Sequence, residues 1–229
     1  MSVTQIATDL YQIGLGGVNA FLIDEDELIL IDTGSPGSAQ EIITAIESIG
    51  RQRNDLKHIL VTHSHPDHAG SLAELKRMTG AVAYMHPAEA TITEIGKLTQ
   101  DMSPAPGMEE MFKQIIGFGS AEYEPVKIEH QVNDGDEILL AGGLTVIHAP
   151  GHCTGQIVLF WSRHRGVLFA ADTCSNVMGL GHSLGYQDFE TGMHTLSNLC
   201  ELNFEIACFG HGAAITKDAS QMFNQKWQH

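Results

Sequence analysis

The chain has 229 residues, of which 43% are hydrophobic and 17% are charged, so it can bury a sizeable core as one large domain or two small ones. Its 28 acidic and 12 basic residues give a formal net charge of −16. Such a surface repels phosphate backbones and anionic membranes, which excludes nucleic acid and membrane as expected partners and leaves a small-molecule substrate.

The N-terminal sequence and the cysteines predict a cytoplasmic protein. Residues 1–17 have neither a basic nor an apolar region of the kind found in a secretory signal. No run approaches the roughly eighteen apolar residues that a membrane span needs. The four cysteines (Cys153, Cys174, Cys200 and Cys208) have neither C-x-x-C spacing nor the density of a disulfide scaffold, which is typical of a reduced chain.

The first third of the chain predicts strands, turns and two helices. Residues 19–34 contain two apolar runs around an acidic turn at 24–27, which predicts a hairpin. Ser35 and Pro36 then open a helical pattern that ends at Gly50. A short buried strand, HILV, leads directly into the sequence THSHPDHAG, and a helix is predicted over 69–80.

The second half repeats this order. Residues 144–156 predict a strand that delivers a histidine into a loop, and residues 156–173 predict a hairpin around 162–166. The sequences LILIDTG and VLFAADT look like one element used twice. A helix over 189–202, a strand over 205–210 and a terminal helix from about Thr216 follow. No linker separates the halves, so we expect a single domain over 1–229 with an α+β fold, an αββα sandwich of two face-to-face β-sheets with helices outside.

Two segments fit neither half and are predicted to be flaps over a pocket. Residues 91–125 carry a series of apolar side chains, namely Met102, Met108, Met111, Phe112, Ile115, Ile116 and Phe118. Residues 175–187 are glycine-rich and follow Asp172. The alternative is an ordinary surface helix and loop.

The sequence VTHSHPDHAG, residues 61–70, places His63, His65, Asp67 and His68 within six positions. The probability of a chance H-x-H-x-D-H in such a chain is on the order of 10⁻³. An extended histidine pair at i and i+2 can bind one ion, and the aspartate and histidine after it can turn toward a second. Neutral imidazoles and carboxylates are ligands that zinc, iron and manganese accept.

One cluster does not complete two coordination shells, so we expect further ligands at the ends of later strands. Three candidates occur there: His152 in APGHCTG, Asp172 in FAADT and His211 in CFGHG. Each lies in a turn of glycine or other small residues, which is expected to leave room for an ion.

These motifs, in this order from LIDTG to GHG, resemble the metallo-β-lactamase-fold hydrolase superfamily. The resemblance implies two divalent metal ions, with Zn²⁺ preferred and iron or manganese as alternatives. It assigns His63, His65 and His152 to the first metal, and Asp67, His68 and His211 to the second, with Asp172 as the bridge. Asp32 matches the family's aspartate beneath the site and would orient ligands without binding metal. The histidines at 65 and 68 are similar to those of the dinuclear hydrolase branch.

The resemblance also implies the chemistry. A hydroxide shared by the two metals would attack a carbonyl carbon, with Asp172 as the bridging ligand and Asp67 orienting the nucleophile or accepting its proton. The apolar segment 102–118 favours a neutral or acyl-bearing substrate, so a lactone, ester or thioester is expected. His182 and Tyr186 are possible substrate contacts.

Several features bear on the substrate class. The 18 residues after His211 contain only Lys217 and Lys226 as basic residues, which disfavours a glutathione thioester. Ser175 stands where acyl-homoserine-lactone hydrolases often have a tyrosine, and the run GHCTGQ departs from the family's frequent Gly-His-Thr-Pro-Gly-His.

Other classes stay open. They are a mononuclear iron persulfide dioxygenase using His63, His152 and Asp172, a phosphodiesterase or β-lactamase, and a non-catalytic metal-binding scaffold. Cys153 and Cys174 are expected to be small buried residues, or else oxidation-sensitive thiols. A homodimer is possible.

Overall fold

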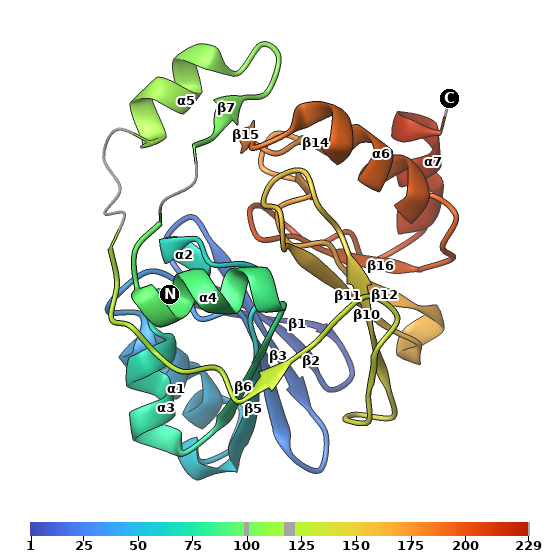
Figure 1. Cartoon of the computed structure of the whole chain (residues 1–229). Helices are drawn as coiled ribbons and strands as arrows, with labels where there is room; N and C mark the ends of the chain where they lie inside the picture. Colours follow the sequence, from blue (N-terminus) through green and yellow to red (C-terminus); the bar gives the residue numbers. More distant parts are fainter. Residues whose placement is uncertain (99–100, 117–121, 229) are drawn as a thin grey trace. The chain divides into compact units, whose positions relative to one another are not determined.

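The computed structural model describes residues 1–98, 101–116 and 122–228, and its internal contacts divide the chain into two compact units (Figure 1). The first unit comprises residues 1–99 and 121–132, and the second comprises residues 100–120 and 133–229. Each unit has its own β-sheet and its own helices, so the mixed α+β content and the two sheets agree with the predicted fold class. The single domain stays a prediction.

The first unit is built on a seven-stranded sheet with strand order β1-β2-β3-β4-β5-β6-β8. Strands β1 to β4 pair antiparallel, and β4, β5, β6 and β8 pair parallel. The predicted hairpin over 19–34 is confirmed as β3 and β4. The strand bounds are β1 (Ser2–Ala7), β2 (Leu10–Gly14), β3 (Asn19–Asp24), β4 (Leu28–Ile31), β5 (Leu56–Leu60), β6 (Val82–Met85) and β8 (His130–Gln131).

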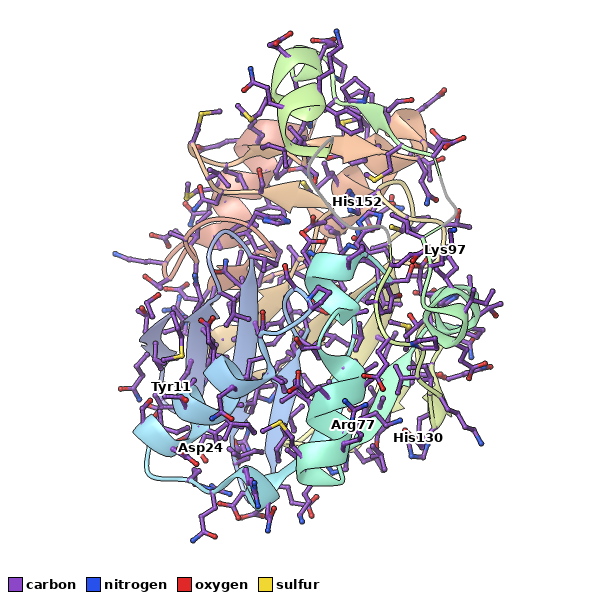
Figure 2. All side chains as sticks on the ribbon, turned by 90° about the vertical axis from the view of Figure 1, so that its left-hand side faces the viewer. Tyr11, Asp24, Arg77, Lys97, His130 and His152 are labelled. Carbon is purple, nitrogen blue, oxygen red and sulfur yellow. The ribbon has the colours of Figure 1, made fainter. Side chains whose placement is uncertain are left out.

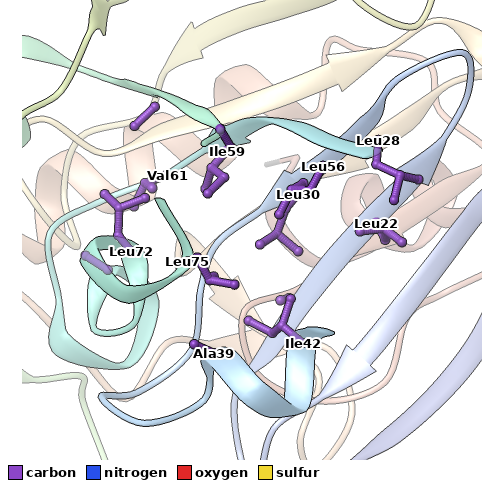
Figure 3. Close-up of a cluster of buried hydrophobic side chains, with 14 of the residues drawn as sticks. Leu22, Leu28, Leu30, Ala39, Ile42, Leu56, Ile59, Val61, Leu72 and Leu75 are labelled. Carbon is purple, nitrogen blue, oxygen red and sulfur yellow. The ribbon is translucent and has the colours of Figure 1, made fainter. Parts of the chain in front are cut away.

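Helices of the first unit cover one face of this sheet. Apolar residues of α1 recur at positions 39, 42, 43 and 46, so one stripe of the helix is buried. Figure 3 shows Ile42 of α1 and Leu72 and Leu75 of α3 among strand residues such as Leu30 and Ile59. Burying each such side chain contributes roughly 1.5–3 kcal/mol to stability. The helix bounds are α1 (Ala39–Ser48), η1 (Arg53–Asp55), α2 (Pro66–Ala69), α3 (Leu72–Thr79) and α4 (Pro87–Ile95).

Two of these helices were predicted from the sequence. The helix that ends before Gly50 is confirmed as α1, but it begins at Ala39, after Ser38 as its N-cap, and not at Ser35 and Pro36. The helix predicted over 69–80 is confirmed as α3 but begins at Leu72, because the histidine cluster forms a separate one-turn helix, α2, opened by Pro66 at its first position.

The second unit is built on a five-stranded sheet with strand order β16-β12-β11-β10-β9. Strands β9 to β12 pair antiparallel, and β16 pairs parallel to β12. The predicted hairpin around 162–166 is confirmed as β11 and β12, joined through η2 (Arg163–Arg165). The strand bounds are β9 (Glu137–Ile138), β10 (Leu144–His148), β11 (Ile157–Trp161), β12 (Val167–Phe169) and β16 (Ile206–Cys208).

Helices α6 (Phe189–Leu199) and α7 (Ala219–Trp227) form the core of the second unit with this sheet. Leu196 of α6 and Phe223 of α7 share one buried cluster with Val158 and Leu168 of the strands. Helix α7 begins three residues later than predicted, because Asp218 has φ 52 in the left-handed region and a helix cannot include it.

The predicted repeat is visible in the topology, since β3-β4-β5 and β11-β12-β16 are both an antiparallel hairpin followed by a parallel strand. The amide of Asp32 donates to Leu60 O at 3.0 Å, and the amide of Ala170 donates equivalently to Cys208 O at 2.8 Å. Asp32 therefore corresponds to Ala170. Asp172 lies two residues further along its strand end, so the two aspartates occupy different positions of the repeat.

Parts of the two predicted flaps contact one another within the second unit. Strand β7 (Ser103–Pro104) pairs with β15 (Gly185–Tyr186), and helix α5 (Glu109–Ile116) follows β7. A Cβ placed at Gly185 would lie 2.5 Å from the Phe112 ring, so this ring covers the backbone of β15. A second short pair joins β13 (Cys174–Ser175) to β14 (Gly181–His182).

The side chains of Ile115, Val177 and Met178 in these segments are more than half exposed. Residues 117–121, including Phe118, lie outside the described residues, and covering of a pocket stays a prediction. No helix in the described part of the chain has the length and apolar character required to cross a membrane.

Candidate metal-binding residues

The first unit gathers three imidazoles in the loop that follows β5. His63, His65 and His68 are buried, and the Asp67 side chain is 39% exposed. His63 Nε2 lies 3.1 Å from His65 Nδ1, and the ring centroids of His63 and His68 are 4.1 Å apart. His65 is the residue before Pro66 and keeps an extended backbone, which lets the chain turn into α2 and bring His68 back under His63.

A buried carboxylate, Asp32, holds both ends of this loop. Its Oδ1 accepts the Thr62 amide at 2.8 Å, its Oδ2 accepts the Thr62 hydroxyl at 2.9 Å, and His68 Nδ1 lies 2.8 Å from Oδ2. An ionised carboxylate can only accept hydrogen bonds, so the Nδ1 atom of His68 is the donor in this contact. In a neutral imidazole, Nε2 then carries the lone pair. Asp32 therefore orients the His68 ring through Nδ1.

The second unit brings His152, Asp172 and His211 together. His152 comes from the turn after β10 and is labelled in Figure 2. Asp172 Oδ2 lies 3.6 Å from His152 Nε2 and 3.1 Å from His211 Nε2. The other nitrogen of His152, Nδ1, donates to Gly185 O at 2.8 Å. One carboxylate oxygen thus lies between two imidazole nitrogens.

The residues of both units suit a metal ion by their chemistry. The groups able to supply ligand atoms are imidazoles, carboxylates and the Cys153 thiol. His63, His68 and His152 each place Nδ1 against an oxygen, which fixes the ring, as is usual for metal-binding histidines. The union of the two groups into one dinuclear site stays a prediction.

The glycines beside His152 and His211 are required by backbone packing. The room for an ion that the sequence led us to expect in these turns stays a prediction. Gly151 has φ 130, and a Cβ there would lie 2.3 Å from the Cα of Gly192 in α6. A Cβ on Gly212, which has φ 97, would lie 2.2 Å from the carbonyl carbon of Asn176. The space at both positions is taken by a second backbone segment, and glycine is needed for that close approach.

We expect Gly151→Ala to lower the free energy of unfolding by about 3 kcal/mol, because the new methyl group collides with backbone atoms of α6 and the residue keeps a positive φ. Urea unfolding followed by circular dichroism measures this change. Gly80→Ala is the matched control: φ is 74 there and nothing lies within 4 Å, so a loss of only about 1 kcal/mol is expected. Equal losses in the two variants would contradict the packing explanation.

The predicted substrate contacts take part in packing of the loop after Asp172. Tyr186 is 1% exposed, donates its hydroxyl to Thr173 O at 2.8 Å and accepts the Ser183 amide at 2.9 Å. Burial raises the pKa of the Tyr186 hydroxyl, so this phenol is neutral. His182 packs against Phe189, and burial, followed by the charge of Lys226, lowers the pKa of its imidazole. Their contact with substrate stays a prediction.

Cys153 and Cys174 are both fully buried. Cys174 belongs to the apolar cluster under α6 and α7, and burial raises the pKa of its thiol, so the thiol is protonated and unreactive. Packing therefore accounts for Cys174.

Two residues that hold the candidate ligands gave little sequence signal. The carbonyl of Gly185 orients His152, but any residue has a carbonyl. The carboxylate of Glu89 accepts hydrogen bonds from Ser64, the residue that stands between His63 and His65 in the sequence. What could have indicated Glu89 in the sequence is its place next to apolar residues of a helix, such as Ala90 and Ile92, which are buried on α4.

Comparison with known proteins finds a matching protein family and solved structures with the same fold. The sequence model of the metallo-β-lactamase superfamily matches residues 13–211. A solved structure of BJP-1, a subclass B3 metallo-β-lactamase of Bradyrhizobium japonicum, matches with a TM-score of 0.73 at 22% identity, covering 100% of this chain and 91% of that one. This likeness shows the fold, with two sheets and helices.

Curated relatives are similar over most of this chain. The uncharacterised protein YobT of Bacillus subtilis (strain 168) is 34% identical over 177 residues, which are 75% of this chain and 70% of YobT. The hydroxyacylglutathione hydrolase of Albidiferax ferrireducens is 31% identical over 154 residues, covering 66% of this chain but 44% of that protein. In three curated relatives other than YobT, this hydrolase included, the matched region covers only 51%, 58% and 44% of the relative's own length.

Proposed function

Because the chain belongs to the metallo-β-lactamase superfamily, we propose that it is a metal-dependent hydrolase of a lactone, ester or thioester. The observation that supports this most is the orientation of the histidines in each unit. His68 and His152 are held through Nδ1 by an oxygen of the protein, so that Nε2 keeps its lone pair. Such a tautomer suits a cation ligand.

We assign two divalent metal ions, preferably Zn²⁺, to the residues of both units. The first would be held by His63, His65 and His152, the second by Asp67, His68 and His211, and Asp172 would bridge them. When bound, divalent ions of this kind lower the pKa of water toward neutrality and polarise a carbonyl oxygen. Asp67 is the carboxylate of this set with the most access to solvent, and we assign it the proton that the attacking water releases.

The substrate class rests on charge and on apolar surface. A net charge of −16 disfavours a polyanionic substrate. Helix α5 presents Met111 and Ile115 at 39% and 54% exposure, which suits an acyl chain. A relative is named hydroxyacylglutathione hydrolase, so a thioester belongs among the substrates to be tested.

Elemental analysis together with a substrate panel tests the proposal. We expect two zinc equivalents per chain, turnover of at least one lactone, ester or thioester, loss of turnover on chelation and its recovery with Zn²⁺. Metal-loaded protein that cleaves none of these but hydrolyses bis-p-nitrophenyl phosphate would show that the substrate class is wrong. One iron equivalent, with oxygen consumption on glutathione persulfide, would show a dioxygenase.

We further propose that the protein acts on its small-molecule substrate in the cytoplasm, without nucleic acid or membrane, and that it can form a homodimer. The acidic composition supports the absence of nucleic-acid and membrane partners, and the cysteine spacing supports the cytoplasmic location. Light scattering of the purified protein measures the oligomeric state.

A further inference from the structure

Glu89 places a fully buried carboxylate beneath the first ligand loop. It lies in the first turn of α4 and is 0% exposed. Its Oε2 accepts two hydrogen bonds from Ser64, one from the amide at 3.0 Å and one from the hydroxyl at 2.5 Å. Ser64 is the residue between His63 and His65, so this contact joins α4 to the centre of the H-x-H pair.

The remaining polar group of Ser64 is also held. The hydroxyl of Tyr123, which is 7% exposed, donates to Ser64 O at 2.7 Å, and the Thr93 hydroxyl lies 3.2 Å from that of Tyr123. The amide, hydroxyl and carbonyl of Ser64 are thus all bonded to α4 and Tyr123. This leaves its backbone little freedom to rotate.

Two buried carboxylates therefore fix the loop from residue 62 to residue 68. Asp32 holds Thr62 and His68 at its ends, and Glu89 holds Ser64 in its middle. A buried carboxylate is costly unless it accepts strong hydrogen bonds, and an apolar residue would pack α4 without that cost. Glu89 is explained if it keeps the His63 and His65 rings in place.

We propose that Glu89 is a positioning residue that acts through Ser64 and prepares His63 and His65 for a divalent metal ion. The inference rests on the proposed function, because it assumes that these histidines bind metal. An ordered loop binds a cation more tightly than one that must be ordered on binding.

The experiment measures the zinc affinity of the full chain by competition with a chromogenic chelator. Partners that orient metal ligands typically cost about 10–100-fold in affinity when mutated, and we expect a loss in this range for Glu89→Ala. Glu89→Gln should lose less, because its amide oxygen can still accept from Ser64. Ser64→Ala, which removes the hydroxyl donor and leaves the core of α4 intact, should weaken binding by about 10-fold. Absorption of the Co²⁺-loaded variants reports any change in the metal environment.

Ile92→Ala is the matched control for stability. Ile92 is buried on the same helix, and its apolar side chain cannot form a hydrogen bond with the loop. It should lower Tm and change zinc affinity less than about twofold. Equal losses of affinity in Ile92→Ala and Glu89→Ala, or wild-type affinity in Ser64→Ala and Glu89→Gln, would overturn the proposal. A wild-type protein that binds zinc but cleaves no substrate would refute the proposed function alone.

Discussion

Replacing Asp172 by alanine is expected to lower kcat/KM by more than about 100-fold, because residues that merely orient a metal ligand already cost 10–100-fold when they are changed. Asp172 Oδ2 is the oxygen on which the Nε2 atoms of His152 and His211 converge. Without it, these two imidazoles lose the carboxylate between them, and the proposed metals lose their bridge. Turnover of the best substrate in the panel and metal content measure the effect.

Asp172→Asn separates charge from shape in this prediction. The amide fills the same buried space, so the variant should fold with nearly wild-type stability. It should lose almost as much activity as Asp172→Ala, because an uncharged amide oxygen is a poorer ligand for Zn²⁺ than a carboxylate oxygen. Unchanged turnover in either variant would contradict the assignment of Asp172 and favour a scaffold that binds metal without catalysis.

The second large effect is expected from Asp32→Ala, which should lower the free energy of unfolding by about 3 kcal/mol or more. The change leaves the Thr62 amide and His68 Nδ1 without their buried acceptor. It also places alanine at φ 61, a left-handed conformation that aspartate and asparagine tolerate better. Urea unfolding measures the loss, and chelator competition measures the accompanying fall in metal affinity.

Asp32→Asn is the control, since it keeps the left-handed backbone and one acceptor oxygen but cannot accept from Thr62 and His68 equally well. We expect an intermediate loss of stability. If Asp32→Ala unfolds with a midpoint within error of the wild type, Asp32 does not hold the loop as described.

The sequence predicted best those features that depend on neighbouring residues. The hairpin at 19–34 followed from two apolar runs around an acidic turn, and helix α1 from a helical pattern that ends at a glycine, although its start was predicted too early. Candidate ligands such as His63 and His152 could be found because strand ends deliver side chains to one edge of a sheet. A histidine in the turn after a buried strand has few roles, and binding a metal ion is one of them.

Features that depend on packing between distant residues could not be predicted. The contact of Gly151 with Gly192 joins a turn to a helix far along the chain, so the packing role of Gly151 could not be predicted from its neighbours in sequence. The register that pairs Asp32 with Ala170, and not with Asp172, becomes visible only from backbone hydrogen bonds. Glu89 stands out in the sequence as an acidic residue among apolar ones, but its contact with Ser64, 25 residues away in the sequence, could not be predicted.

Gly185 limits how this protein could be re-engineered. Its carbonyl orients His152, its backbone pairs with Pro104, and the Phe112 ring covers its α-carbon. An exchange of residues 103–116 for another sequence, made to alter substrate preference, would at the same time change the support of His152, a proposed metal ligand. Segments 103–116 and 181–187 therefore form one module for design, and a graft that transfers both should keep metal affinity where a graft of the first alone should lose it.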